Sequence, residues 1–227
     1  MANPKLLPEP FKVVGALWSL FSERDFATDV GHSLVRISVS FLLALLIALP
    51  LGMLMGTFPF AEGMLNPLVS PFRYLPAASF VPLLLMWLGP GDQQKITLLI
   101  LGVIWFLITA FMDDTKQVRQ DLIETAQTLG AKRMNVVSHV VFRAALPSHL
   151  DTTRQLLAVS WTYLVIAEIV AATTGIGAMM MRAKRFVRVD EILAGIVTIA
   201  ILGLLLDLIL RWIRWGCFPW ARSTTRF

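Results

Sequence analysis

Long apolar runs that carry almost no charge restrict what this chain can fold into. The clearest run covers residues 34–56 and has one charged side chain, Arg36, near its start. About 20 mostly apolar residues in helical form cross the hydrocarbon core of a bilayer, so this run is long enough. Charged residues make up 15% of the chain, against roughly 25% in soluble domains, which leaves too few to cover a water-facing surface. The sequence therefore predicts an all-α, polytopic membrane protein.

Four further segments fit the same pattern, which gives about five predicted spans. Residues 64–88 are apolar but include four prolines: Pro67, Pro71, Pro76 and Pro82. Because each proline removes a backbone donor and favours a kink, this second span is expected to be broken. The other predicted spans are residues 96–112, 156–172 and 192–212, and the last two contain Glu168 and Asp207.

The first 33 residues are expected to form an extracytoplasmic or interfacial segment, and residues 34–227 the membrane-spanning domain. Residues 11–21, "FKVVGALWSLF", are apolar but too short to cross a bilayer, and they lie between "LLPEP" and "SERD". This pattern favours an interfacial or soluble helix. The segment lacks the basic start and the small-residue cleavage site of a signal peptide.

Several kinds of site are not expected in this chain. Its single cysteine, Cys217, excludes a disulfide within one chain and a cysteine-based zinc site, and its three histidines are scattered. No metal site, cofactor or catalytic group is therefore predicted. The net charge of +5 fits basic residues that flank membrane spans and meet lipid headgroups, so membrane lipid, and not nucleic acid, is the expected partner.

A long polar insert, residues 113–154, interrupts the apolar runs. Before Gly130, apolar residues recur at helical spacing: Val118, Leu122, Ala126 and Leu129. This spacing predicts an amphipathic helix that the glycine ends. A second apolar stripe follows and is predicted to end at Pro147. On pattern alone, two interpretations fit equally well: a loop on the membrane surface, or a projecting surface that binds a soluble partner.

The insert also carries a motif. Glu124-Thr125-Ala126 is followed, after three residues, by Gly130-Ala131. This arrangement resembles the EAA loop of the membrane subunits of bacterial ABC importers. Three other stretches resemble the nitrate, sulfonate, taurine and bicarbonate branch of that family: "FVPLLLMWLGPGDQQKI" at 80–96, "YLVIAEIVAATTGIGAMM" at 163–180 and "VDEILAGIVTIAILGLLLDLILR" at 189–211.

The resemblance implies a type I, MetI-like ABC importer permease in the bacterial cytoplasmic (inner) membrane. In such a permease the EAA loop is cytoplasmic and contains the coupling helix, which contacts a separate ATPase. The residues that would make this contact are Glu124, Thr125, Ala126, Gly130, Ala131, Lys132 and Arg133. The resemblance also implies three kinds of partner: a second permease copy that completes a homodimer, cytoplasmic ATPase subunits that bind the ATP, and an extracytoplasmic solute-binding protein.

The sequence contains no phosphate loop of the form G-x-x-x-x-G-K-[ST], so ATP hydrolysis is expected in the separate subunit and the chain is not expected to be an enzyme. Two features depart from the family pattern. Phe142-Arg143 stands where Leu-Pro usually closes the motif. The sequence also begins at a segment that usually follows one more transmembrane helix, so either the core is shorter here or the true start lies upstream.

Ionisable groups within spans usually face a bundle interior or a water-filled path. Arg73 follows Pro71 in the broken second span, and it either attracts an anion along the translocation path or forms a structural ion pair. Glu168 would repel an anion, so a structural pair or a hydrogen bond to a helix end is favoured over a place in the path. Asp207 is expected to pair with Arg211, one turn further on.

Two other patterns stand out. Gly52 and Gly56 form a G-x-x-x-G pair that lets helices approach closely, and packing within the chain is favoured over a dimer contact. The basic cluster "RAKRFVR", residues 182–188, is expected on the outer face. There it either anchors lipid headgroups or meets an acidic binding protein or an anion.

Other classes of protein remain alternatives. A secondary transporter or channel subunit would need no ATPase, but the inverted halves common in such transporters are not visible in the sequence. An intramembrane enzyme would need a nucleophile with a base, or a metal cluster, which the isolated Glu168 and Asp207 do not supply. For an importer, the expected solute is a small organic or inorganic anion such as a sulfonate, taurine, nitrate or bicarbonate, and a neutral vitamin or its precursor is the alternative.

Overall fold

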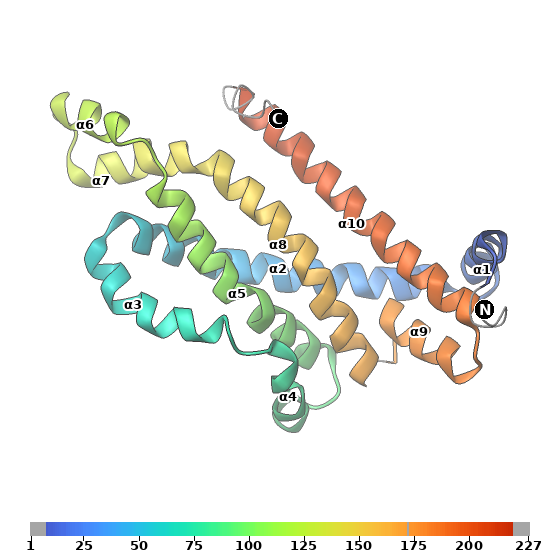
Figure 1. The fold of residues 1–227 in the computed structure, drawn as a ribbon. Helices are drawn as coiled ribbons and strands as arrows, with labels where there is room; N and C mark the ends of the chain where they lie inside the picture. Colours follow the sequence, from blue (N-terminus) through green and yellow to red (C-terminus); the bar gives the residue numbers. More distant parts are fainter. Residues whose placement is uncertain (1–7, 172, 220–227) are drawn as a thin grey trace, which may run out of the picture. The chain divides into compact units, whose positions relative to one another are not determined.

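The computed structural model describes residues 8–171 and 173–219, which form helices joined by turns (Figure 1). In chain order these are α1 (Pro10–Glu23), α2 (Phe26–Thr57), α3 (Pro59–Phe72), the 3-10 helix η1 (Ala77–Phe80), α4 (Val81–Leu88), α5 (Asp92–Lys116), α6 (Gln120–Thr128), α7 (Arg133–Asn135), the π-helical turn η2 (Val136–Val141), α8 (Phe142–Ala171), α9 (Ile176–Arg185) and α10 (Val189–Cys217). The predicted all-α class is confirmed. The ends of the two predicted segments, residues 1–7 and 220–227, lie outside the described part.

Three of these helices, α2, α5 and α10, are long and apolar enough to cross a membrane. The number rises to four if the broken pair of Pro59–Phe72 and Ala77–Leu88 counts as one span. This pair is the predicted second span, and the expected break is present between Phe72 and Ala77. The predicted fourth span, residues 156–172, forms the last part of α8, apart from residue 172, which is not described. That helix is not among those counted by length and composition.

The helices divide into two compact units. Within the described residues, the first unit contains the chain up to Phe41 together with Ala77–Gly102 and Val159–Leu206. The second contains Leu42–Pro76, Val103–Ala158 and the chain from Asp207 onward. Four long helices, α2, α5, α8 and α10, therefore contribute one part to each unit.

An apolar core joins α1, the start of α2, α9 and the first half of α10 in the first unit. Its buried side chains are Ala16, Leu20, Phe26, Ile176, Met179, Ala183 and Ala194. The rings of Phe21 and Phe26 meet edge to face with their centroids 5.1 Å apart, which fixes the turn between α1 and α2. Because α2 begins at Phe26, the first long helix starts earlier than the span predicted at residue 34.

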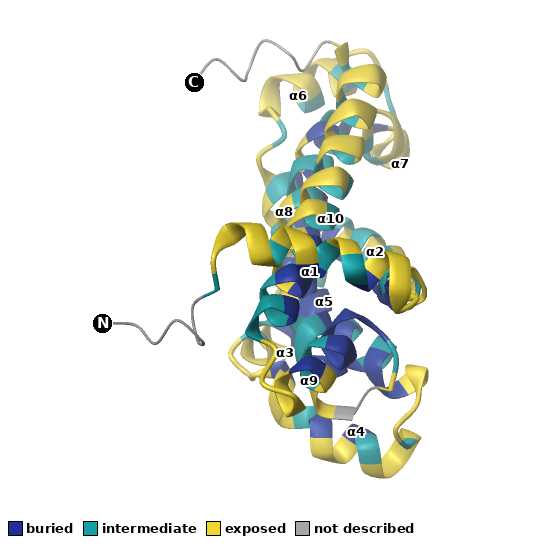
Figure 2. Ribbon diagram, turned by 90° about the vertical axis from the view of Figure 1, so that its right-hand side faces the viewer, coloured by how far each residue is buried: buried dark blue, intermediate teal, exposed yellow. Residues whose placement is uncertain are grey.

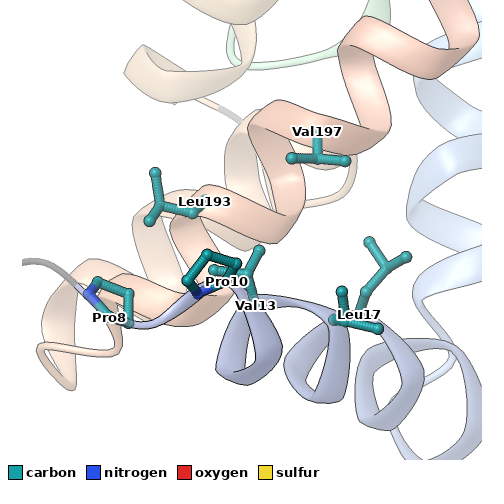
Figure 3. Close-up of a pocket in the computed structure, with 7 residues that line it drawn as sticks. Pro8, Pro10, Val13, Leu17, Leu193 and Val197 are labelled. Carbon is teal, nitrogen blue, oxygen red and sulfur yellow. The ribbon is translucent and has the colours of Figure 1, made fainter.

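The helix predicted at residues 11–21 is present as α1, and Pro10 occupies its first turn, where a missing N–H is harmless. A cavity of about 400 Å³ lies between α1 and the first turns of α10. Apolar side chains line it, with Val13 and Leu17 on one side and Leu193 and Val197 on the other (Figure 3). Elsewhere on α1, Phe11 and Trp18 are exposed. Apolar exposure of this kind suits a helix in the membrane interface, and that location stays a prediction.

Two glycines of α2 allow close packing against α5 in the second unit. A Cβ added at Gly52 would lie 2.6 Å from Cβ of Phe111 and 2.7 Å from the carbonyl oxygen of Ile108. A Cβ added at Gly56 would lie 2.6 Å from Cβ of Thr115. These contacts are too short for any side chain, so the G-x-x-x-G pair packs within the chain, as predicted.

The polar insert differs from its prediction at two places. α6 begins at Gln120, so Val118 lies in the turn ahead of the helix. The helix after Gly130 does not end at Pro147, because residues 133–171 form α7, η2 and α8 in direct succession. A proline removes a single N–H, and the buried side chains of Ala145 and His149 hold the helix in place on either side of it. The predicted helix end at Pro147 is therefore wrong.

The glycine contact gives a test of stability. Gly52→Ala should destabilise the chain by about 1–3 kcal/mol, because the backbone of α5 cannot yield to the new methyl group as a flexible side chain would. Gly63→Ala in α3 is the matched control, since no described atom lies within 4 Å of its added Cβ. Unfolding in mixed micelles with an increasing fraction of SDS measures both variants. Equal stability of the two would contradict the close packing of α2 on α5.

Candidate functional site

The amphipathic helix α6 ends in a hydrogen-bonded glycine turn in the second unit. The N–H of Gly130 donates to the carbonyl of Gln127 (2.9 Å), and the N–H of Ala131 donates to the carbonyl of Ala126 (3.0 Å). This pair of bonds is the Schellman motif, which needs a left-handed residue after the helix. Gly130 supplies it with φ of 82°. The glycine and alanine of the sequence motif thus fix a sharp turn between α6 and α7.

α6 exposes most of its surface, and none of its residues is fully buried (Figure 2). Ile123 and Ala126 are half-buried, while Leu122 is exposed and Leu129 after the helix is 83% exposed. Among the seven predicted contact residues, Ala126 and Ala131 are half-buried, and the other five are exposed: Glu124, Thr125, Gly130, Lys132 and Arg133. The turn therefore gathers all seven predicted residues at one projecting surface, called here the α6 surface (residues 120–134).

Charges at the start of α6 favour the helix. Arg119 precedes the helix and donates from Nε to Oδ1 of Asp121 at 3.1 Å. This hydrogen bond lowers the pKa of the Asp121 carboxyl, so the group stays ionised in the first turn. A negative charge at that position interacts favourably with the N-terminal end of the helix dipole.

One contact joins the α6 surface to the α2–α3 connection of the same unit. The guanidinium of Arg133 lies over the ring of Phe58, 5.1 Å from its centroid. Both side chains line a mostly apolar cavity of about 550 Å³ together with residues of α2 and α3. Arg133, predicted to contact an ATPase, is thus partly engaged in a cation–π contact within the chain.

A buried histidine joins the two helices from which the insert projects. Nδ1 of His149 in α8 lies 3.3 Å from Oδ2 of Asp114 in α5, and Nε2 lies 3.4 Å from Oγ1 of Thr115. Thr152 donates to the same Asp114 oxygen at 2.7 Å. Since α5 leads into the insert and α8 leads out of it, this cluster holds the two ends of the insert together.

The first unit contains a buried cluster of charges around Glu168. Its Oε1 accepts hydrogen bonds from Nη1 of Arg36 (2.7 Å) and from the hydroxyl of Ser33 (2.7 Å). Its Oε2 accepts the N–H of Gly177 at 2.8 Å. The ion pair and the helix-end hydrogen bond expected for Glu168 are therefore both present. Burial of both charged side chains makes this pair the main electrostatic contact between α2 and α8 in this unit.

The same cluster caps the start of α9. The backbone N–H groups of Gly175, Ile176 and Gly177 donate to Asp29, Ser33 and Glu168, respectively. A helix start leaves such N–H groups without partners, and here side chains of α2 and α8 supply the acceptors. Gly175 has φ of 109°, and a Cβ at this position would collide with the Glu168 carboxylate. The "GIG" of the sequence is thus explained by the approach of Glu168.

Arg36 has two further partners, Thr174 and Asp92. Nη1 and Nη2 donate to the carbonyl and hydroxyl of Thr174, at 2.8 and 2.6 Å. Nε donates to Oδ1 of Asp92 at the start of α5, at 2.9 Å.

The basic cluster at residues 182–188 also has partners within the chain. Arg182 pairs with Asp29, and Arg188 pairs with Glu191 at 2.7 Å. At least two of the basic residues at 182–188 are therefore engaged within the chain.

The other predicted charges lie in the second unit. Arg73 follows α3, and its Nε is buried without a hydrogen-bond partner among the residues of known placement. Asp207 pairs with Arg211 at 3.2 Å, as predicted, and also receives Nε and Nη2 of Arg154. The structure does not assign Arg73 or Glu168 to a translocation path, so that assignment stays a prediction.

Sequence analysis missed most of the buried cluster, although α2 carried a signal. Asp29, Ser33, Arg36 and Ser40 recur at steps of three and four residues and so form one polar stripe on a helix that is otherwise apolar. Such a stripe predicts a buried polar partner. Glu168 and Thr174 are more than 130 positions away, and no local pattern connects them to it.

Comparison with known proteins places these features in a family. Residues 48–214 match the family model of the binding-protein-dependent transport system inner membrane component. The chain belongs to this family. It is therefore the permease subunit of an ABC importer and a multi-pass membrane protein, and its partners include an ATPase and a binding protein.

Similar permeases match nearly the whole chain. The taurine transport system permease protein TauC of Escherichia coli is 36% identical over 225 residues, which cover 97% of this chain and 82% of TauC. A putative aliphatic sulfonates transport permease protein, SsuC of Bacillus subtilis, is 29% identical and covers 98% of this chain and 81% of its own. The nitrate import permease protein NrtB of Synechocystis is 27% identical, with 88% and 76% covered.

Solved structures support the permease fold. The MetNI methionine ABC transporter in inward-facing conformations matches with a TM-score of 0.66 and 21% identity, over 94% of this chain and 99% of the other. An importer of the polysaccharide alginate matches with a TM-score of 0.63 and 15% identity, over 88% and 82%. At these identities the likeness concerns the fold alone, and it confirms the MetI-like architecture.

The buried ion pair gives a test of this permease's stability. Glu168→Gln and Arg36→Met should each destabilise the chain by about 3–5 kcal/mol, because each leaves the other group buried with its charge unbalanced. The double variant should lose clearly less than the sum of the two. Glu9→Gln, in an exposed pair with Lys12, is the control and should leave the SDS unfolding midpoint unchanged. Additive losses in the double variant would contradict a direct Arg36–Glu168 interaction.

Proposed function

We propose that this permease subunit imports a small organic solute that carries a sulfonate group, and that the α6 surface is where its ATPase binds. The exposed helix α6 on its glycine turn is the observation that carries the second part. By this proposal α6 is cytoplasmic, a second copy of the chain completes the path, and a binding protein delivers the solute from the other side.

The geometry of the insert supports coupling. A short helix that is fixed at its turn and exposes Leu122 and Leu129 offers an apolar surface for a soluble partner. The Schellman bonds make the helix and turn a rigid element, and the His149–Asp114 cluster attaches the insert firmly to α5 and α8. Motion of the ATPase can thus pass into both helices without being absorbed by a flexible loop.

The solute class rests on the relatives and on charge. The names of three relatives refer to taurine, aliphatic sulfonates and nitrate, and the identity is higher with the taurine permease (36%) than with the nitrate permease (27%). Arg73 has a buried Nε that no described acceptor satisfies. A guanidinium N–H in that state can donate to an oxygen of a sulfonate.

Substitutions on α6 test the coupling assignment. Leu129→Asp should reduce co-purification of the ATPase at least about tenfold, because a charge replaces an exposed apolar contact, a loss of about 1.4 kcal/mol or more. Gly130→Pro should have the same effect by removing the left-handed turn. The matched control is Gln117→Asp, an exposed position ahead of α6 and outside the α6 surface, which should retain the ATPase. Full retention of the ATPase by Leu129→Asp would exclude the α6 surface as its binding site.

Transport assays test the solute. Proteoliposomes that contain the permease, its ATPase and its binding protein should take up taurine in an ATP-dependent manner, and other sulfonates should compete better than nitrate or bicarbonate.

The same assay tests Arg73. Arg73→Ala should lower taurine uptake about tenfold or more with the ATPase still bound, because a charged hydrogen bond to the sulfonate contributes roughly 1.5–3 kcal/mol. Arg73→Lys keeps the charge and should lose less. Normal uptake by Arg73→Ala would remove this residue from the path, and uptake of a solute without a sulfonate group in place of sulfonates would overturn the solute class.

A further inference from the structure

An exposed carboxylate covers two buried cations in the first unit. Oδ1 of Asp92, the first residue of α5, lies 2.9 Å from Nε and 2.8 Å from Nη2 of Arg36, and 3.5 Å from Nζ of Lys95. The side chain of Asp92 is 58% exposed, whereas those of Arg36 and Lys95 are 3% and 4% exposed. One oxygen of an exposed group therefore lies beside two buried positive groups.

The rest of the structure holds Arg36 in place without Asp92. Its Nη1 is bound to Glu168 and to the carbonyl of Thr174, and its Nη2 also donates to the hydroxyl of Thr174. The edge formed by Nε and Nη2 consequently keeps its direction when Asp92 moves. Such an edge binds two oxygens of a carboxylate, sulfonate or phosphate side by side.

The charges of the cluster define what can replace Asp92. Without it, the side chains of Arg36 and Lys95 carry two positive charges, and the buried Glu168 carries one negative charge. The remaining net charge is +1. Because an unbalanced buried charge is strongly unfavourable, a bound anion with a single negative charge has to take the place of the Asp92 carboxylate.

We propose that Asp92 occupies a binding site for a singly charged oxyanion, and that the solute's sulfonate group displaces it during transport. This inference rests on the proposed import of sulfonates. Asp92 begins α5, a helix that is long and apolar enough to cross a membrane, and Lys116 at its end leads into the insert that the proposal places in the cytoplasm. The site therefore lies at the end where the binding protein delivers the solute.

Methanesulfonate tests the site, with dimethyl sulfone as a neutral molecule of the same shape. The purified complex of permease and ATPase is kept in a dilute Tris chloride buffer that contains no other oxyanion, and its melting temperature is measured against the concentration of each compound. A tethered group that fills the site weakens the apparent affinity of a free anion in proportion to its occupancy. Asp92→Asn should therefore bind methanesulfonate about tenfold more tightly than the unmodified complex, with no response to dimethyl sulfone.

Two further variants support the comparison. Lys95→Met removes one of the two cations and should weaken methanesulfonate binding about tenfold or more in the Asp92→Asn background. Asp190→Asn, which removes a carboxylate from the first turn of α10, is the control and should behave as the unmodified complex does. If Asp92→Asn is unstable in the dilute chloride buffer, it is purified in methanesulfonate, and recovery that is equally poor in methanesulfonate and in dimethyl sulfone overturns the inference.

The outcomes separate this inference from the proposed function. Unchanged methanesulfonate affinity in Asp92→Asn, together with normal sulfonate uptake by the unmodified complex, overturns only the role of Asp92. Absence of sulfonate uptake by the unmodified complex overturns the proposed solute. If chloride and methanesulfonate raise the melting temperature of Asp92→Asn equally, the site binds small anions in general, and the assignment to an oxyanion is overturned.

Discussion

The ion pair between Arg36 and Glu168 is the interaction on which the first unit depends. Neither charge can remain alone in an apolar interior, so α2 and α8 have to meet where these residues lie. Glu168 then approaches the start of α9 so closely that only glycine fits at Gly175 and Gly177. One buried pair thus determines the contact of two helices, the position of a third and two glycines in the sequence.

In the second unit, close packing and a buried polar contact hold the helices from which the exposed helix α6 extends. Gly52 and Gly56 bring α2 against α5 at van der Waals distance, and the His149–Asp114 contact joins α5 to α8. Both contacts lie near the ends of the insert. The exposed α6 is therefore attached to packed helices through a hydrogen-bonded turn, which is the mechanical requirement for passing motion from a soluble partner to membrane helices.

The sequence predicts those parts of the fold that depend on local patterns. Hydropathy locates the long helices, prolines locate the break before Ala77, and Gly130 with its spacing of apolar residues locates the turn after α6. The helix end predicted at Pro147 is wrong, because packing on both sides of a proline can keep a helix continuous. The partners of Arg36 could not be predicted, since Asp92 is 56 positions away and Glu168 is 132, and pairing at that distance follows only from the fold.

The arrangement around Arg36 also bears on how an importer can bind its solute and still release it. Two buried cations with no competing carboxylate would hold an anion too tightly for rapid passage, because a transport site has to bind its solute and let it leave. By our proposal, the Asp92 carboxylate, which contacts both cations, competes with the solute, weakens its binding and restores neutrality when the solute leaves. In that view Asp92 sets the affinity of the site, while Glu168, which is bound on all sides by Arg36, Ser33 and Gly177, keeps the cluster in place in both states.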